Sequence, residues 1–365
     1  MSYEENGMPK KNPLSAQIDL SKFGTDDFEP ATGEEKKQQE VMGESVTFFK
    51  DGCRRLSRNK LAMASLIVLI VLIVSIIVLP MIIPYGYSDI IKVDGKRDKT
   101  AANLAPFTYS QREMEYMERT GEKLFPHVMG TDSLCRDYFI RVIYGTRVSL
   151  TVGLVASIMV LVIGLLYGSI SGWCGGMVDM VMMRIVDIIY SLPDTLMVIL
   201  LSVVLNQTLK PVIENIPFLQ VIGTNMIALF LVFGLLYWVG MARLVRGQIL
   251  TIKQNEYVLA ARTIGTSSGR ILRKHILPNC LSVIIITTAL QIPSAIFTES
   301  YLSFLGIGVK VPMPSLGSLA NEARDGLLSY PYKLIFPAAV ICVIVLAFNL
   351  LGDGLRDAFD PKLKR

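Results

Sequence analysis

Few residues in this sequence are arranged for hydrolytic chemistry. The stretch GTSSG at residues 265–269 matches the G-x-S-x-G nucleophile motif, which needs a strand before its serine and a helix after it. Both flanks have helical periodicity instead. Only His275 follows Ser267, and no acid lies between them, so the order serine, acid, histidine cannot be built. We interpret the match as accidental and expect a chain that is not an enzyme.

Metal and nucleotide sites also lack their usual ligands. The sequence has two histidines, His127 and His275, and five cysteines without paired spacing. We expect no metal site, and no disulfide at Cys135, which alone among the cysteines falls in a predicted external loop. The phosphate-binding pattern G-x-x-x-x-G-K-[ST] is absent from the sequence. The chain therefore does not bind ATP in this way, and any energy that drives its function must come from another chain or from an ion gradient.

Long apolar runs decide the class of protein. The 365 residues are 52% hydrophobic and only 18% charged. Five runs are uncharged and long enough to span a membrane as helices, and a sixth is less clean because it contains Asp187, Pro193 and Asp194. In chain order the runs are 61–83, 148–170, 185–205, 221–242, 280–298 and 334–352. We predict an all-α integral membrane protein with six transmembrane helices.

Basic residues predict how the chain is oriented and divided. The segment 243–279 contains seven Lys and Arg residues, whereas Lys210 is the only basic residue of the loop 206–220. Because Lys and Arg concentrate on the cytoplasmic side, we predict cytoplasmic termini. The expected parts are a largely flexible tail at 1–60, a first helix at 61–83, an extracytoplasmic loop at 84–147, a five-helix core at 148–356 and a cytoplasmic tail at 357–365. The net charge of +5 is spread over membrane flanks, so we expect no nucleic-acid partner.

Small residues, prolines and charges predict details of the packing. A series of glycines at every fourth position of the second run lets another helix approach closely, and we expect this contact within the chain rather than with a partner. Pro193 should interrupt the third run. Arg184 and Asp187 are three residues apart and should pair on one helix face. The glycines are Gly164, Gly168 and Gly172.

The stretch Glu256–Asn279, EYVLAARTIGTSSGRILRKHILPN, is polar although it lies between two apolar runs. Apolar residues at 257, 260, 261 and 264 form one face of a first helix, which Gly265 is expected to end in a left-handed conformation. A second, basic helix should stop at Pro278, just before the fifth run. Two interpretations stay open on physical grounds: a helix on the membrane surface, or a helix-turn-helix that docks into a cytosolic partner.

This stretch resembles the EAA loop of ABC-importer permeases, whose pattern is roughly E-A-A-x3-G-x9-I-x-L-P. Leu259 and His275 depart from it, as in the similar peptide-importer branch. The fitting residues are Ala260, Ala261, Gly265, Leu277 and Pro278. Further stretches that resemble the "C"-type permease of oligopeptide and dipeptide importers are RNKLAM (58–63), GTDSLCRDYFIRVIYGTRVSL (130–150), LSFLGIGV (302–309) and LAFNLLGDGLRDAFDP (346–361). The resemblance covers about 50–361, with departures at Cys135 for a usual Gly and Ile140 for a common Ser.

The resemblance implies a type I ABC-importer permease fold in a bacterial cell membrane. The loop 256–279 would form the coupling helix that fits a groove of a cytosolic ATPase. Implied partners are a homologous permease, two ATPase subunits that bind ATP and magnesium, an extracytoplasmic peptide-binding protein and membrane lipid. Arg262, Arg270, Arg273 and Lys274 could pair with ATPase acids or lipid headgroups. The implied coupling residues are Glu256, Tyr257, Ala260, Ala261, Arg262, Gly265, Arg270 and Pro278.

Other transporters remain as alternatives. Permeases for nickel, glutathione or opines resemble the same branch, and the choice of substrate lies largely in the binding protein. A secondary transporter would need ionisable groups at mid-membrane, whereas the five clean runs carry none. An intramembrane hydrolase is disfavoured because the serine and histidine cannot form the required arrangement.

Overall fold

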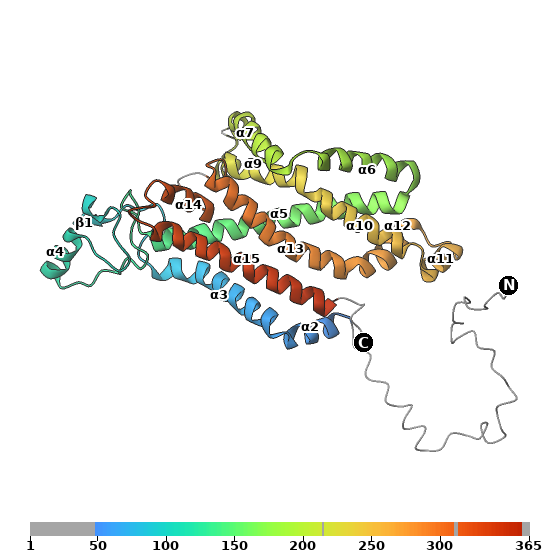
Figure 1. The fold of residues 1–365 in the computed structure, drawn as a ribbon, viewed down its shortest axis with the longest axis horizontal. Coiled ribbons are helices and arrows are strands. Elements are labelled where there is room, and N and C mark those ends of the chain that lie inside the picture. Colours follow the sequence, from blue (N-terminus) through green and yellow to red (C-terminus); the bar gives the residue numbers. More distant parts are fainter. Residues whose placement is uncertain (1–47, 214, 310–312, 360–365) are drawn as a thin grey trace, which may run out of the picture. The chain divides into compact units, whose positions relative to one another are not determined.

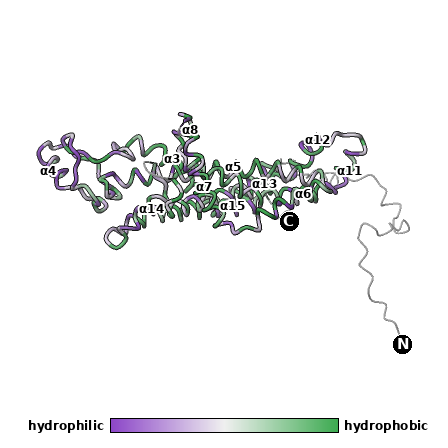
Figure 2. The backbone as a smooth tube through the Cα atoms, turned by 90° about the horizontal axis from the view of Figure 1, so that it is seen from above, coloured by the Kyte–Doolittle hydropathy of each residue, from purple (hydrophilic) through white to green (hydrophobic). Residues whose placement is uncertain are grey.

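The computed structural model describes residues 48–213, 215–309 and 313–359, and helices dominate this part of the chain. Six of its helices are long and apolar enough to cross a membrane, which confirms the predicted class. Figure 2 shows that hydrophobic residues follow these helices, while hydrophilic segments gather around α4 and around α11 and α12. The six spans are Lys60–Ile82, Tyr138–Cys174, Asp194–Ile213, Thr224–Ile252, Ser268–Phe304 and Tyr332–Phe359.

The elements follow one another as helices joined by short connections, apart from one small extramembrane segment. The helices are α2 (Phe48–Arg58), α3 (Lys60–Ile82), α4 (Gln111–Thr120), α5 (Tyr138–Cys174), α6 (Gly176–Ser191), α7 (Asp194–Ile213), α8 (Pro217–Ile222), α9 (Thr224–Val232), α10 (Trp238–Ile252), α11 (Glu256–Thr263), α12 (Ser268–Ile271), α13 (Leu277–Phe304), α14 (Leu316–Arg324) and α15 (Tyr332–Phe359). Shorter elements are the antiparallel strands β1 (Lys92–Val93) and β2 (Lys96–Arg97), the 3-10 turn η4 (Lys99–Ala101) and the π-helical segments η5 (Phe233–Tyr237) and η6 (Leu272–Ile276).

The N-terminal segment differs from the prediction where it approaches the membrane. Residues 48–58, which were expected to belong to a largely flexible tail, form the helix α2, whereas 1–47 lie outside the described residues. The side chain of Asn59 then caps α3 by accepting hydrogen bonds from the backbone N–H groups of Leu61 and Ala62. Phe49 contacts Phe359 edge to face, which gives α2 a partner at the end of α15.

The two polar segments lie at opposite ends of the helices (Figure 1). The segment with β1, β2 and α4 lies at one end, and α11 and α12 lie at the other, toward which α2 and the end of α15 also point. Tertiary contacts place α5 against both α10 and α13, and α15 packs against α3 and α13. A rigid set of helices therefore connects the two ends.

The glycine series of α5 packs against α10, as predicted for contact within the chain. A Cβ atom at Gly168 would lie 2.5 Å from the backbone oxygen of Ala242, and one at Gly164 would lie 2.6 Å from the Met241 side chain. A Cβ atom at Gly172 would also contact α10, at 3.1 Å from the Ile249 side chain. The two backbones approach closely because these positions carry no side chain.

The third span is interrupted at Pro193, as predicted. α6 ends at Ser191 and α7 begins at Asp194, so the third span runs over Asp194–Ile213 and not over 185–205 as expected. The predicted pairing of Arg184 with Asp187 is wrong. The Asp187 carboxylate instead forms an ion pair with Arg243 of α10, with 2.7 Å between the nitrogen and the oxygen. A neighbouring helix thus supplied a cation that helical spacing alone could not reveal.

The expected stop at Pro278 is also wrong. The basic helix continues through η6 into α13, giving one helical span from Ser268 to Phe304. Pro278 lies in the first turn of α13, where the loss of its N–H costs least, and the π-helical segment directly before it shifts the hydrogen-bond register.

Candidate functional site: the loop that carries α11

α11 ends in a tight turn that the sequence correctly predicts. Gly265 has φ +78°, a conformation that L-residues with a side chain rarely adopt. Its N–H donates to the Arg262 carbonyl at 3.0 Å, and the next N–H, of Thr266, donates to the Ala261 carbonyl at 3.1 Å. These bonds satisfy the last carbonyls of α11 and turn the chain toward α12.

The two faces of α11 are divided differently from the prediction. Val258 and Ala261 are buried and pack with Ile249, Ile271 and Ile276 of the same chain. Ala261 was expected to share a partner-facing surface with 257, 260 and 264, but it faces inward because α11 needs an apolar anchor on its own bundle.

The outer face of α11 is open to contact. Tyr257 is 42% exposed and Ile264 is 80% exposed, and Ala260 lies between them on the exposed side. The amide of Asn279 donates to the Tyr257 hydroxyl at 3.1 Å, which connects α11 to the first turn of α13. The remaining predicted residues of this site, Glu256, Arg270 and Pro278, are exposed.

Arg262 has a partner inside the chain that the sequence did not indicate. Its guanidinium carbon lies 4.8 Å from the centroid of the Trp173 ring, at the end of α5. The Lys253 ammonium donates to the Trp173 carbonyl at 2.6 Å, and so connects α10 to the same point. Arg262 therefore contacts α5 within the chain, and its pairing with an ATPase or a headgroup stays a prediction. An aromatic residue at the end of a span beside basic loops was the available signal.

A second ion pair holds α6 to α10 near the same end. Two nitrogens of Arg246 contact the two oxygens of Asp179 at 2.5 and 2.6 Å, and the Ser171 hydroxyl donates to the same carboxylate. The hydrogen bonds from Arg246 lower the pKa of Asp179 below its usual value, against the effect of burial, and the bond from Ser171 adds to this. This pair thus fixes α6 to the helix that leads into α11.

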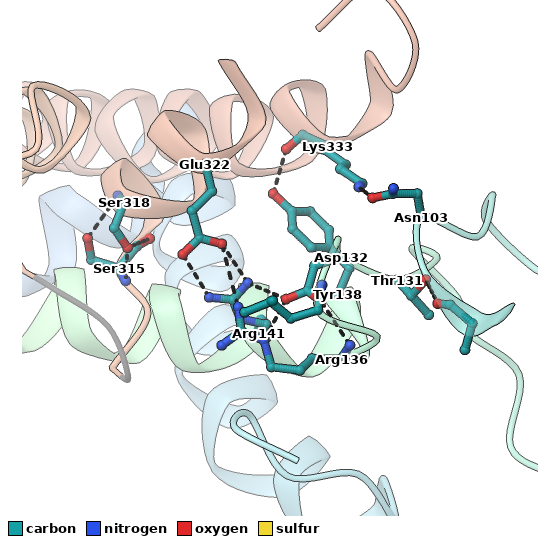
Figure 3. A network of polar contacts seen from close by, with 12 residues as sticks. Asn103, Thr131, Asp132, Arg136, Tyr138, Arg141, Ser315, Ser318, Glu322 and Lys333 are labelled. Atoms are coloured by element: carbon teal, nitrogen blue, oxygen red, sulfur yellow. Dashed lines mark hydrogen bonds and ion pairs between the residues drawn. The ribbon is translucent and has the colours of Figure 1, made fainter. Parts of the chain in front are cut away.

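A polar cluster occupies the opposite end of the bundle (Figure 3). The buried guanidinium of Arg141 contacts Asp132 at 2.7 Å and the two oxygens of Glu322 at 2.7 and 3.0 Å. Arg136 contacts Asp132 at 2.6 Å. The cluster joins the extramembrane segment to α5 and α14, and sequence reasoning did not identify it because its members lie far apart in the chain.

The contacts of Tyr138 continue this cluster toward α15. Its hydroxyl donates to the Lys333 carbonyl at 2.6 Å, and the Lys333 ammonium donates to the side-chain oxygen of Asn103. A buried carboxylate, Glu299, lies next in the interior, where it accepts 2.7 Å bonds from the hydroxyls of Ser149 and Ser303. The ammonium of Lys333 and the carboxylate of Glu299 are thus both hydrogen-bonded, as burial requires.

Family models match both the N-terminal and the C-terminal parts of the chain. The family model described as binding-protein-dependent transport system inner membrane component matches residues 164–365. The model described as N-terminal TM domain of oligopeptide transport permease C matches residues 47–113.

Curated relatives are similar over most of the chain. The oligopeptide transport system permease protein OppC of Bacillus subtilis (strain 168) is 39% identical over 340 residues, which cover 93% of this chain and 97% of that protein. The dipeptide transport system permease protein DppC of the same organism is 41% identical over 90% of this chain and 91% of its own length. The glutathione transport system permease protein GsiD of Pectobacterium atrosepticum is 39% identical over 65% of this chain and 73% of its own. With its six membrane spans, this chain belongs to the family of binding-protein-dependent transport system inner membrane components, the permease subunits of ABC importers.

Proposed function

We propose that this chain forms half of the translocation path of an ATP-driven importer for oligopeptides or dipeptides. The observation that carries the proposal is the match to peptide permeases along almost the whole chain, from the N-terminal helices to the end of α15. The exposed face of α11 supports it, because that helix is anchored by one side and free on the other.

The proposal includes the partners that a permease subunit requires. A homologous permease completes the path, two ATPase subunits bind ATP and magnesium, and an extracytoplasmic binding protein delivers the peptide. This chain itself is non-catalytic and holds no cofactor. Its termini and α11 lie in the cytoplasm, which the seven Lys and Arg residues of 243–279 support. Lipid contacts the exposed apolar side chains of helices such as α3.

Coupling would pass from α11 into the bundle through two contacts. When the ATPases close, α11 moves with the groove that holds its outer face. Val258 and Ala261 transmit this motion to α10 and α13 by packing, and Arg262 transmits it to α5 through Trp173. The bundle then rocks between outward- and inward-facing states, each favoured by different ligands.

The related substrate classes are separated by direct uptake. Cells that lack this chain would be complemented with it and given radiolabelled trialanine, glutathione or nickel. We expect ATP-dependent uptake of trialanine. Uptake of glutathione or nickel without peptide would instead support one of the related importers. Of these two, glutathione import is the one that the similarity to a glutathione permease supports. Uptake that persists without ATPase subunits would indicate a secondary transporter and contradict the proposal.

A further inference from the structure

A cavity of about 470 Å³ lies where α6 ends, α7 begins and η5 passes beside them. Its volume falls within the range of sites that bind small molecules. Aliphatic side chains form much of the wall, together with the rings of Tyr190 and Tyr237 and the carboxylate of Asp194. The cavity therefore combines apolar surface with a single acidic group.

Two irregular stretches of backbone meet at this cavity. One is the break at Leu192 and Pro193, and the other is the π-helical segment that ends at Tyr237. Tyr237 lies close to the middle of the span Thr224–Ile252. Irregular backbone at membrane depth persists where it is covered by protein or lines a cavity, and π-helical segments often occur at functional sites.

Asp194 is the one charged residue that lines the cavity, and its side chain is exposed. Within the described ranges, no ion pair is formed by Asp194, whereas Arg243 is engaged by Asp187 at 2.7 Å and lies over the Tyr190 ring at 4.2 Å. A position at the start of α7 favours an acidic residue through the helix dipole, but this does not account for the cavity beside it. An ionisable group at the end of a membrane span, beside a cavity, is a candidate for function.

We propose that this cavity binds the amino-terminal end of a peptide during its passage. The inference rests on the peptide import proposed above. The peptide ammonium pairs with Asp194, and the aliphatic wall contacts the first side chain. Because peptides with different side chains share this ammonium, such a site serves many sequences.

Photo-crosslinking tests occupancy directly. The complete importer, with its partner permease, ATPases and binding protein, is reconstituted with p-benzoylphenylalanine in place of Met197, which lines the cavity. Radiolabelled trialanine should label this chain, and excess unlabelled trialanine should suppress the labelling. Asp194→Asn should lower labelling by about tenfold, which corresponds to about 1.4 kcal/mol, and Asp194→Glu should retain it because the charge is kept. Asp357→Asn, at an exposed carboxylate of α15, is the control and should change nothing.

Filling the cavity provides a second test that leaves every charge in place. A Cβ atom at Gly240 or at Gly247 meets no heavy atom within 4 Å, and only Gly240 lines the cavity. Both glycines lie on α10, two turns apart. Gly240→Leu should slow trialanine uptake by about tenfold, whereas Gly247→Leu should leave it within about twofold of the native rate.

The outcomes separate this inference from the proposed function. If the native importer takes up no peptide, the proposed function fails. If it takes up trialanine, but Asp194→Asn labels normally or the two glycine variants behave alike, the cavity does not bind the peptide. Labelling that unlabelled trialanine cannot suppress would likewise overturn the site.

Discussion

The guanidinium of Arg262 lies over the ring of Trp173, 4.8 Å from its centroid, so that α11 rests on the end of α5. The carbonyl of Trp173 accepts a hydrogen bond from Lys253 of the α10–α11 connection. α5 in turn packs against α10 along its glycines. The short helix α11 is therefore connected to the close contact between α5 and α10.

Removing the ring of Trp173 should loosen this connection. An exposed cation–π contact is worth about 0.5–1 kcal/mol, so Trp173→Leu should lower uptake per ATP hydrolysed by about threefold in proteoliposomes. Trp173→Phe keeps an aromatic face and should retain most of the coupling. Equal coupling in the native protein and Trp173→Leu would show that Arg262 transmits no motion to α5.

Adjacent alanines of α11 should respond differently to the same substitution. Ala261 is 7% exposed, so Ala261→Glu buries a charge. This substitution should lower the free energy of unfolding by about 2–5 kcal/mol and reduce the yield of purified chain. Ala260 faces outward, so Ala260→Glu should fold normally but fail to co-purify with ATPase subunits. Normal ATPase binding by Ala260→Glu would contradict docking through this face.

The turn after α11 should tolerate only glycine. Gly265→Ala places a side chain at φ +78° and should cost about 1–2 kcal/mol. Gly265→Pro also removes the hydrogen bond to the Arg262 carbonyl, and should uncouple ATP hydrolysis from uptake while the protein still reaches the membrane. Paired assays of ATP hydrolysis and peptide uptake check this result. If both variants transport normally, this turn has no part in coupling.

The extramembrane segment should lose stability at alkaline pH. His127 is fully buried, and burial lowers its pKa, but hydrogen bonds from its two ring nitrogens to Asp137 and Glu113, at 2.8 and 3.0 Å, outweigh this and raise the pKa to about 9. The stabilisation is complete below the unfolded pKa near 6.5 and is lost as pH rises through about 9. Its size is about 3 kcal/mol.

Hydrogen exchange of residues 84–137, corrected for intrinsic rates, measures this loss in the full chain. Protection should fall between pH 7 and pH 10 in the native protein. His127→Gln should be less protected at pH 7 and should show no step near pH 9. A step of the same size in that variant would assign the titration to another group.

Breaking the buried cluster around Arg141 should be costly. Its side chain is fully buried between Asp132 and Glu322, so Arg141→Met removes the bidentate partner of Glu322 and leaves Asp132 with Arg136 alone. Loss of one partner of a buried ion pair costs about 3–5 kcal/mol, which should lower the apparent unfolding midpoint in detergent. Arg147→Met, at an exposed position of the same helix, is the matched control. Equal midpoints would show that the cluster adds little to stability.

The sequence by itself determined the class of the protein and several local features of its backbone. The lengths of the apolar runs predicted the membrane spans, Pro193 predicted the break between α6 and α7, and Gly265 predicted the left-handed turn. The glycines of α5 predicted a close helix contact within the chain. Each of these follows from backbone sterics or from transfer of side chains out of water, which depend on neighbours in the sequence.

Only the tertiary structure decided which side chains meet. Asp187 pairs with Arg243, not Arg184, and Ala261 faces its own bundle, because neighbouring helices supplied a cation in one case and an apolar surface in the other. Helical spacing describes the faces of one helix but not which helix lies against each face. The same reason hid the contact of Arg262 with Trp173 and the cavity beside Asp194, whose walls come from separate segments of the chain.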